Sequence, residues 1–221
     1  MSATFRGVVF DLDGTLIDSM PLVIEAYASA VAPYLTPKSD DEWLVTFGGP
    51  PDRIFERLVA DPVARDDVRR RFAALAASSW KRIRPFDGVG AMLDDLRAAG
   101  CALAIWTGRD RESAEWLLQE HGIAGYFAAC VCGDDLESHK PDTAGLVEIL
   151  RRLGLTPAQA LFVGDSPVDV QAGVALGVRT VLVTHGQTPD AAGAKEAWRV
   201  CASTQEAYQF VRTAVGGSGG K

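Results

Sequence analysis

The sequence predicts an α/β fold, a Rossmann-like parallel sheet with helices on both faces and an all-helical cap inserted after the first strand. Short apolar runs alternate with helical patterns along most of the chain, which is typical of a parallel sheet covered on both faces. Most of these runs end in a small polar or acidic residue. The segment 17–84 interrupts the alternation with helical patterns alone.

Five apolar runs are expected to form the main strands. They cover residues 5–10, 101–106, 126–132, 160–163 and 179–183. A shorter apolar segment at 200–202 is expected to add an edge strand. The carboxyl ends of parallel strands lie along one edge of the sheet, where ligands bind in such folds. We therefore expect Asp11, Thr107, the pair Asp134-Asp135 and Asp165, which come just after four of these runs, to converge there.

Helices are expected between the strands and at the end of the chain. Their patterns cover residues 89–99, 111–121, 142–153, 168–176 and 204–215. Asp142 and Ser203 stand where N-cap residues belong. Gly154 and Gly177 stand where a glycine ends a helix. These boundary signals predict regular helices of ordinary length.

The segment 17–84 is expected to form a cap domain without strands. Helical patterns cover residues 21–34, 40–47, 52–59 and 66–83, and a loop rich in glycine and proline lies at 47–51. We divide the chain into a discontinuous core (1–16 and 85–215), the cap (17–84) and a flexible tail (216–221). An insertion directly after the first strand would lie over the same sheet edge and close on a substrate.

Composition excludes several classes of protein. The 221 residues are 48% hydrophobic with a formal net charge of −7, which disfavours a general nucleic-acid grip. We interpret the basic clusters at 69–71 and 81–84 as solvated helix faces. No stretch approaches the roughly 18 apolar residues of a membrane span. The beginning of the chain is not patterned as a signal peptide. Four cysteines in apolar surroundings favour free thiols and a cytoplasmic location.

Acidic residues at two strand ends predict a metal site. Asp11 and Asp13 lie two residues apart just past the first run, and Gly14 permits a sharp turn there. A carboxylate can attack an anionic phosphoryl group only if a cation neutralises the charge. With Asp165 as a third ligand, these oxygens suit Mg²⁺.

Other residues at the same edge suit a phosphate. Thr107 and Gly108 offer a hydroxyl and an open backbone N–H to phosphate oxygens. Lys140 is a compact cation able to pair with both the phosphate and the attacking carboxylate. Asp169 is expected either to bind the metal through water or to orient Lys140.

Four motifs together resemble the haloacid dehalogenase superfamily. They are FDLDGT (10–15), IWTGR (105–109), HKPD (139–142) and GDSPVD (164–169). The helical insertion is similar to that of members with a C1 cap, such as phosphoglycolate phosphatases and β-phosphoglucomutases. The resemblance covers nearly the whole chain.

The resemblance implies a role for each matching residue. Asp11 would be the nucleophile that forms an aspartyl-phosphate, and Asp13 the general acid and then base. The backbone carbonyl of Asp13, rather than its carboxylate, would bind the metal together with Asp11 and Asp165. The remaining assignments are phosphoryl binding for Thr107 and Gly108, charge stabilisation for Lys140, and support of the site for Asp169.

Three further residues bear on the substrate. Many members of the resembled family have asparagine or another small polar residue after the threonine of the second motif, where this chain has Gly108-Arg109. Arg109 is either a ligand for a second anionic group of the substrate or a surface arginine. Gly49 and Arg53, in and beside the cap loop, are candidate substrate contacts. For Arg53 the alternative is a salt bridge with Asp52 or Glu56. His139, His121 and His185 are interpreted as ordinary loop or surface residues.

These observations predict a magnesium-dependent phosphomonoester hydrolase that acts through an aspartyl-phosphate. The substrate would be a small phosphorylated metabolite, such as a sugar phosphate or a phosphoglycolate-like ester. Dehalogenase and phosphonatase members lack the second aspartate, so Asp13 argues against those activities. A phosphomutase of the β-phosphoglucomutase type and a metabolite-binding regulatory protein on the same scaffold remain alternatives. The protein is expected to be a monomer or a homodimer.

Overall fold

The computed structural model describes residues 5–44, 46–47, 51–188 and 195–216. Its main sheet has six parallel strands in the order β5-β4-β1-β6-β7-β8. Their bounds are β1 Gly7–Phe10, β4 Ala102–Trp106, β5 Phe127–Val131, β6 Ala160–Gly164, β7 Arg179–Val183 and β8 Arg199–Cys201. All six match predicted runs, including the edge strand β8. Because β1 pairs with both β4 and β6, the residues that follow these three strands are neighbours.

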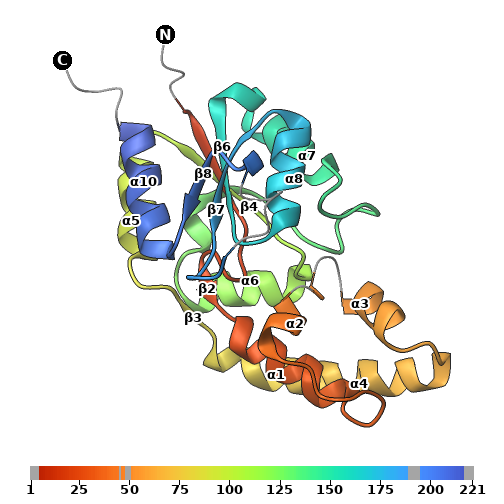
Figure 1. Cartoon of the computed structure of the whole chain (residues 1–221). Helices are drawn as coiled ribbons and strands as arrows, with labels where there is room; N and C mark the ends of the chain where they lie inside the picture. The colour runs from red at the N-terminus through yellow and green to blue at the C-terminus, as the bar shows by residue number, and fades with distance from the viewer. Residues whose placement is uncertain (1–4, 45, 48–50, 189–194, 217–221) are drawn as a thin grey trace.

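Helices cover both faces of this sheet, as predicted (Figure 1). One face carries α5 Val89–Ala98, α6 Arg111–Glu120 and α10 Thr204–Gly216, and the other carries α7 Ala144–Leu153 and α8 Pro167–Leu176. The side chains of the central strand β1 pack on both faces of the sheet. Val8 and Phe10 pack into one hydrophobic cluster, whereas Val9 packs into the other, because side chains alternate along a strand. Three short 3₁₀ helices complete this part and its connection to the helical layer: η1 Trp80–Arg82, η2 Ala124–Tyr126 and η3 Pro157–Gln159.

Most of the predicted helix boundaries are confirmed. Gly154 and Gly177 end α7 and α8 with φ of 64° and 77°. Ser203 caps α10 by accepting a hydrogen bond from the Glu206 amide at 3.2 Å. The prediction for Asp142 was wrong, because α7 begins at Ala144 after Thr143. The Asp142 carboxylate instead accepts the Ala144 amide at 2.9 Å, a local turn that competes with the cap.

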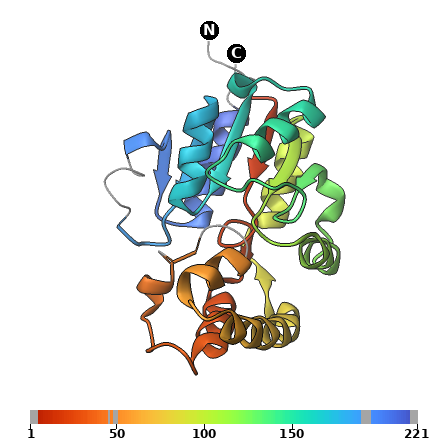
Figure 2. The same ribbon diagram turned by 90° about the vertical axis from the view of Figure 1, so that its right-hand side faces the viewer.

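The inserted segment forms a separate helical layer beside the sheet (Figures 1 and 2). It contains α1 Met20–Val31, α2 Asp40–Leu44, α3 Pro51–Leu58 and α4 Pro62–Ser79. These helices share a hydrophobic cluster of their own, in which Tyr27 packs against the rings of Trp43, Phe55 and Phe72. An aromatic core of this kind gives the layer internal stability.

The expectation that residues 17–84 contain no strand was wrong. Strand β2 (Ile17–Asp18) pairs antiparallel with β3 (Arg84–Pro85), so the chain enters and leaves the helical layer along one short ribbon. Two-residue strands have no alternating pattern to detect, because a period of two needs several residues. The division into core and cap at 16/17 and 84/85 stays a prediction, and this ribbon lies at both junctions.

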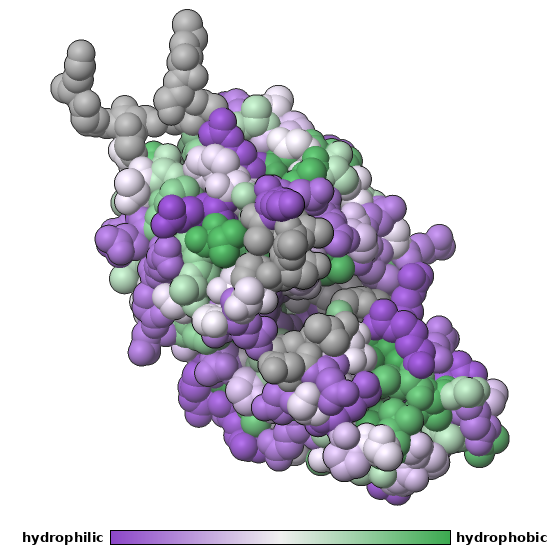
Figure 3. Space-filling view, viewed as in Figure 1, coloured by the Kyte–Doolittle hydropathy of each residue, from purple (hydrophilic) through white to green (hydrophobic). Residues whose placement is uncertain are grey.

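The surface carries the predicted solvated basic face and a hydrophobic area. The basic run on α4 is solvated, with Arg69 paired to Asp52 and Asp66 and Arg71 paired to Asp67. Figure 3 shows a mostly hydrophilic face, with a hydrophobic area over the helical layer. Within the described residues, no helix is both long and apolar enough to cross a membrane.

All four cysteines are free thiols, as predicted. The sulfur atoms of Cys130 and Cys132 lie 3.5 Å apart, in contact but not bonded. Cys101, Cys132 and Cys201 are buried in the larger hydrophobic cluster. Their role in packing agrees with the interpretation of these thiols as small apolar side chains.

Candidate active site

The loop after β1 carries the predicted nucleophile. Asp11 continues the strand, because its amide donates to the Val163 carbonyl of β6 at 2.8 Å. Gly14 then turns the chain with φ of 74°. A Cβ atom at this position would lie 2.0 Å from Asp165 Oδ2, so only glycine permits the approach. The loop is therefore held directly against the carboxylate of Asp165.

Three carboxylates meet at this sheet edge. Asp11, Asp165 and Asp169 each offer one oxygen, and these oxygens all lie within 4.8 Å of one another. Asp169 fits because Gly164 has no side chain: a Cβ atom there would lie 2.4 Å from Asp169 Oδ2. The three residues come from two strand ends and the first turn of α8.

Burial makes this cluster electrostatically costly. It raises the pKa of Asp11 to about 7, and the charge of Asp169 adds to the rise while Lys140 opposes it. Burial and the charges of Asp11 and Asp169 raise the pKa of Asp165 well above its ordinary value. Oxygen ligands that repel one another in this way fit a hard divalent cation such as Mg²⁺.

Lys140 supplies a cation inside the cluster. Its Nζ lies 2.8 Å from Asp11 Oδ1 and 2.8 Å from Asp169 Oδ1, and its side chain is 9% exposed. Its ammonium also lies 5.0 Å from the centre of the Trp106 ring. Burial opposes the charged form, but the two carboxylates outweigh it and raise the pKa of Lys140. Lys140 thus lies between Asp11 and Asp169, an arrangement consistent with the prediction that Asp169 orients the lysine.

The carboxylate of Asp13 lies outside the three-carboxylate cluster. Arg109 Nε donates to Asp13 Oδ2 at 3.0 Å, and a second nitrogen of the guanidinium donates to Oδ1. The Ser19 hydroxyl also donates to Oδ1. Burial alone would raise the pKa of Asp13, but the charge and hydrogen bonds of Arg109 outweigh it and lower the pKa. The carboxylate is therefore not placed to join Asp11 and Asp165 as a metal ligand.

Thr107 and Gly108 lie next to Asp11 at the end of β4. The Thr107 amide donates to the Val131 carbonyl at 3.0 Å, and its buried hydroxyl accepts the Arg109 amide at 3.1 Å. Gly133 packs directly against Gly108, since a Cβ atom at position 133 would lie 2.2 Å from the Gly108 carbonyl oxygen. This turn is anchored on both sides.

The residues predicted on the helical layer are only partly placed. Gly49 lies outside the described residues. Arg53 belongs to α3, and its charge adds to burial in lowering the pKa of His139. The charge of Arg53 thus acts on the residue that precedes Lys140. Asp52, one of the alternative partners considered for Arg53, instead pairs with Arg69 at 2.7 Å.

Three residues that support the site were not predicted. Ser19 holds Asp13, His185 Nε2 lies 2.7 Å from the Gly14 carbonyl oxygen, and the Tyr208 hydroxyl donates to the Thr15 carbonyl. His185 was interpreted as an ordinary residue, yet its ring joins the nucleophile loop to β7. These contacts join residues as far as 193 positions apart, so no local pattern signals them.

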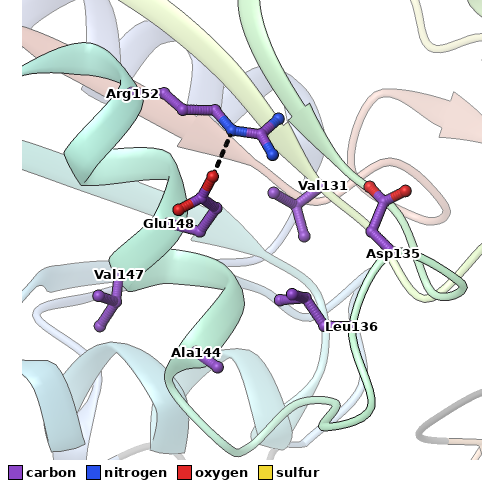
Figure 4. A pocket seen from close by; sticks show the side chains of 7 residues that line it. All are labelled: Val131, Asp135, Leu136, Ala144, Val147, Glu148 and Arg152. Carbon is purple, nitrogen blue, oxygen red and sulfur yellow. Dashed lines mark hydrogen bonds and ion pairs between the residues drawn. The ribbon is translucent and has the colours of Figure 1, made fainter.

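A hollow of about 310 Å³ lies elsewhere, between β5 and α7 (Figure 4). Its lining includes Val131, Leu136 and Val147 with the ion pair of Glu148 and Arg152. The hollow is lined mainly by apolar side chains and this ion pair, and it contains none of the carboxylates or the lysine of the cluster around Asp11. The hollow is therefore separate from the carboxylate cluster around Asp11.

A Rossmann-like sheet with a helical insertion after β1 and an acidic cluster at its carboxyl edge is an arrangement that suits a small ligand bound beside a metal ion. The sequence model for haloacid dehalogenase-like hydrolases matches residues 8–183. The chain belongs to this family, which confirms the resemblance carried by the four motifs.

Relatives and solved structures agree with this membership. Phosphoglycolate phosphatase 1 of Pseudomonas aeruginosa is 35% identical over 190 residues, which are 82% of this chain and 70% of the relative. A structure described as a predicted phosphoglycolate phosphatase from Haemophilus somnus 129pt is 25% identical, covers 94% of this chain and 98% of its own, and has a TM-score of 0.82. CbbY from Rhodobacter sphaeroides in complex with phosphate, 21% identical, covers 92% of this chain and 96% of its own with a TM-score of 0.76, a likeness of fold.

Proposed function

We propose that the protein is a magnesium-dependent phosphomonoester hydrolase acting on a small phosphorylated metabolite through an aspartyl-phosphate. The observation that carries this proposal is the pairing of Asp11 with Lys140 at the edge of the three-carboxylate cluster. A buried carboxylate beside a cation suits attack on an anionic phosphoryl group. The similarity to phosphoglycolate phosphatases supports the same class of substrate.

Each residue has a distinct task in this proposal. Asp11 attacks phosphorus, and Lys140 stabilises the charge on the phosphoryl oxygens. Thr107 and the Gly108 amide bind the same oxygens from the neighbouring strand. Asp13 protonates the leaving alcohol and then activates the water that hydrolyses the aspartyl-phosphate.

The metal fits the residues present. Asp11, Asp165 and the backbone carbonyl of Asp13 would hold Mg²⁺, and Asp169 lies within the same cluster. Bound there, Mg²⁺ supplies positive charge that neutralises phosphate and nucleophile. The displacement of the Asp13 carboxylate toward Arg109 supports the assignment of its backbone oxygen rather than its side chain.

The test is phosphate release from a panel of small phosphate esters, with and without Mg²⁺. Asp11→Asn is expected to abolish turnover while the thermal melt stays cooperative. Asp87→Asn, at an exposed position, is the matched control and should keep full activity. Magnesium-independent turnover, or full activity of Asp11→Asn, would refute the proposed chemistry.

Two alternatives are distinguished by the product. A phosphomutase would return the phosphoryl group to a second hydroxyl and yield an isomeric sugar phosphate rather than free phosphate. A regulatory protein would bind a phosphorylated metabolite without turnover. The four free thiols accord with a cytoplasmic location, which we include in the proposal.

A further inference from the structure

Arg109 occupies both oxygens of the proposed acid and base. Its guanidinium donates to Asp13 Oδ1 and Oδ2, and Ser19 donates to Oδ1 as well. The side chains of Arg109 and Asp13 are 11% and 22% exposed, so water competes little for this pair. A two-pronged contact between guanidinium and carboxylate is among the stronger and more directional hydrogen-bonded pairs in proteins. Asp13 is therefore held in one orientation by a neighbour 96 residues away.

This contact conflicts with the task proposed for Asp13. To protonate a leaving oxygen or take a proton from water, at least one carboxylate oxygen must face the reacting group at hydrogen-bond distance. Both oxygens already accept hydrogen bonds from Arg109 or Ser19, and of the two only Oδ2 accepts a single one. Release of part of the Arg109 contact would therefore open Asp13 to the reacting group.

A second anion on the substrate can take over the guanidinium. The turn that carries Arg109 is anchored through Thr107, and the guanidinium lies against Asp13, two residues from the proposed nucleophile. Lys140 is already shared between two carboxylates. Arg109 is thus the cation whose present partner, Asp13, is needed for the reaction. Its planar guanidinium matches the geometry of a carboxylate or a phosphate on the substrate.

We propose that Arg109 binds a second anionic group of the substrate and, in exchanging Asp13 for that group, frees Asp13 to act as acid and base. The inference rests on the proposed phosphatase function and narrows its substrate class. The preferred substrates are phosphate monoesters that carry a carboxylate or a second phosphate within a few bonds of the scissile ester. Arg109 is then both a substrate ligand and a positioning residue for Asp13.

The test compares two esters that differ by one charge. 2-Phosphoglycolate carries a carboxylate beside its phosphate, whereas methyl phosphate does not. A gained charge-assisted contact predicts a kcat/KM about 10- to 100-fold higher for 2-phosphoglycolate in the wild-type protein. In Arg109→Gln this ratio should fall to about one. Its kcat for methyl phosphate should rise, because Asp13 keeps only its hydrogen bond from Ser19.

A second measurement separates substrate-driven release from a merely structural role. Free formate supplies the missing carboxylate when methyl phosphate is the substrate. It should raise kcat saturably in the wild-type protein and leave Arg109→Gln unaffected. Arg109→Lys, which keeps the charge but not the fork, should retain part of the preference. Arg97→Gln, which removes an exposed arginine on α5, is the matched control for lost charge and should behave as the wild type.

The results have distinct consequences. Equal kcat/KM for the two esters, or equal losses on both in Arg109→Gln and Arg109→Lys with unchanged melting curves, would overturn the inference and leave the phosphatase function standing. A preference for 2-phosphoglycolate that is lost in Arg53→Gln but kept in Arg109→Gln would move the anion site to the helical layer and also overturn it. No phosphate release from either ester, or from any of the wider panel, would refute the function and the inference together.

Discussion

Replacement of Lys140 by methionine tests whether this residue balances the charge of the carboxylate cluster. The change keeps an apolar stem of similar length beside Trp106 and Phe162 but removes the ammonium that lies 2.8 Å from both Asp11 and Asp169. Two buried carboxylates then lose their common partner. The loss of one member of a buried ion pair costs about 3–5 kcal/mol. We therefore expect the free energy of unfolding of the metal-free protein to fall by about this amount.

Magnesium should reverse part of this loss. A ligand that binds only the folded state stabilises it by about 2.7 kcal/mol at 100 times its dissociation constant. Because the lysine no longer competes for the carboxylates, Mg²⁺ should stabilise Lys140→Met more than it stabilises the wild type. Phosphatase turnover should nevertheless fall, since the charge beside Asp11 is lost.

Urea unfolding at pH 8, in EDTA and in Mg²⁺, measures both effects. Lys81→Met, at an exposed position, is the control and should change stability little. If Lys140→Met matched the wild type in EDTA, or if Mg²⁺ stabilised both proteins equally, the charge-balance argument would be refuted.

Three further predictions concern stability around the same loop. Gly14→Ala should lower the free energy of unfolding by at least about 1 kcal/mol, because φ at this position is 74° and the new Cβ would displace Asp165. Urea unfolding and Mg²⁺-dependent turnover measure the effect. Burial raises the pKa of Asp11 to about 7, so between pH 4 and 7 the folded state binds more protons than the unfolded state. The stability of the metal-free protein in EDTA should therefore fall as pH rises through this range. Melting temperatures should show a weaker fall in Asp165→Asn, which removes a neighbouring carboxylate whose pKa is also raised. Tyr208→Phe removes the hydrogen bond to the Thr15 carbonyl and should cost about 1 kcal/mol in urea unfolding, and an unchanged midpoint would contradict it.

Local sequence patterns were sufficient to predict the strands of the main sheet and most of the helix ends. Apolar runs identified six strands, and the glycines at 154 and 177 marked helix ends, because these signals act within a few residues. The boundary that was predicted wrongly lies at Asp142, whose carboxylate accepts the Ala144 amide in a local turn before the helix begins. The ribbon of β2 and β3 was missed because pairing between residues near 17 and 84 has no local signal.

For the candidate active site, too, some features could be predicted from the sequence and others depend on the tertiary structure. The sequence by itself predicted that Asp11, Thr107 and Asp165 would lie at one edge, since the strand ends of a parallel sheet meet there. Tertiary structure alone decided how their charges are shared: Lys140 joins Asp11 to Asp169, while Arg109 and Ser19 draw Asp13 away from both. The physical reason is that electrostatic partners are chosen by distances of a few ångströms in a buried environment, and such distances are set by packing rather than by position along the chain.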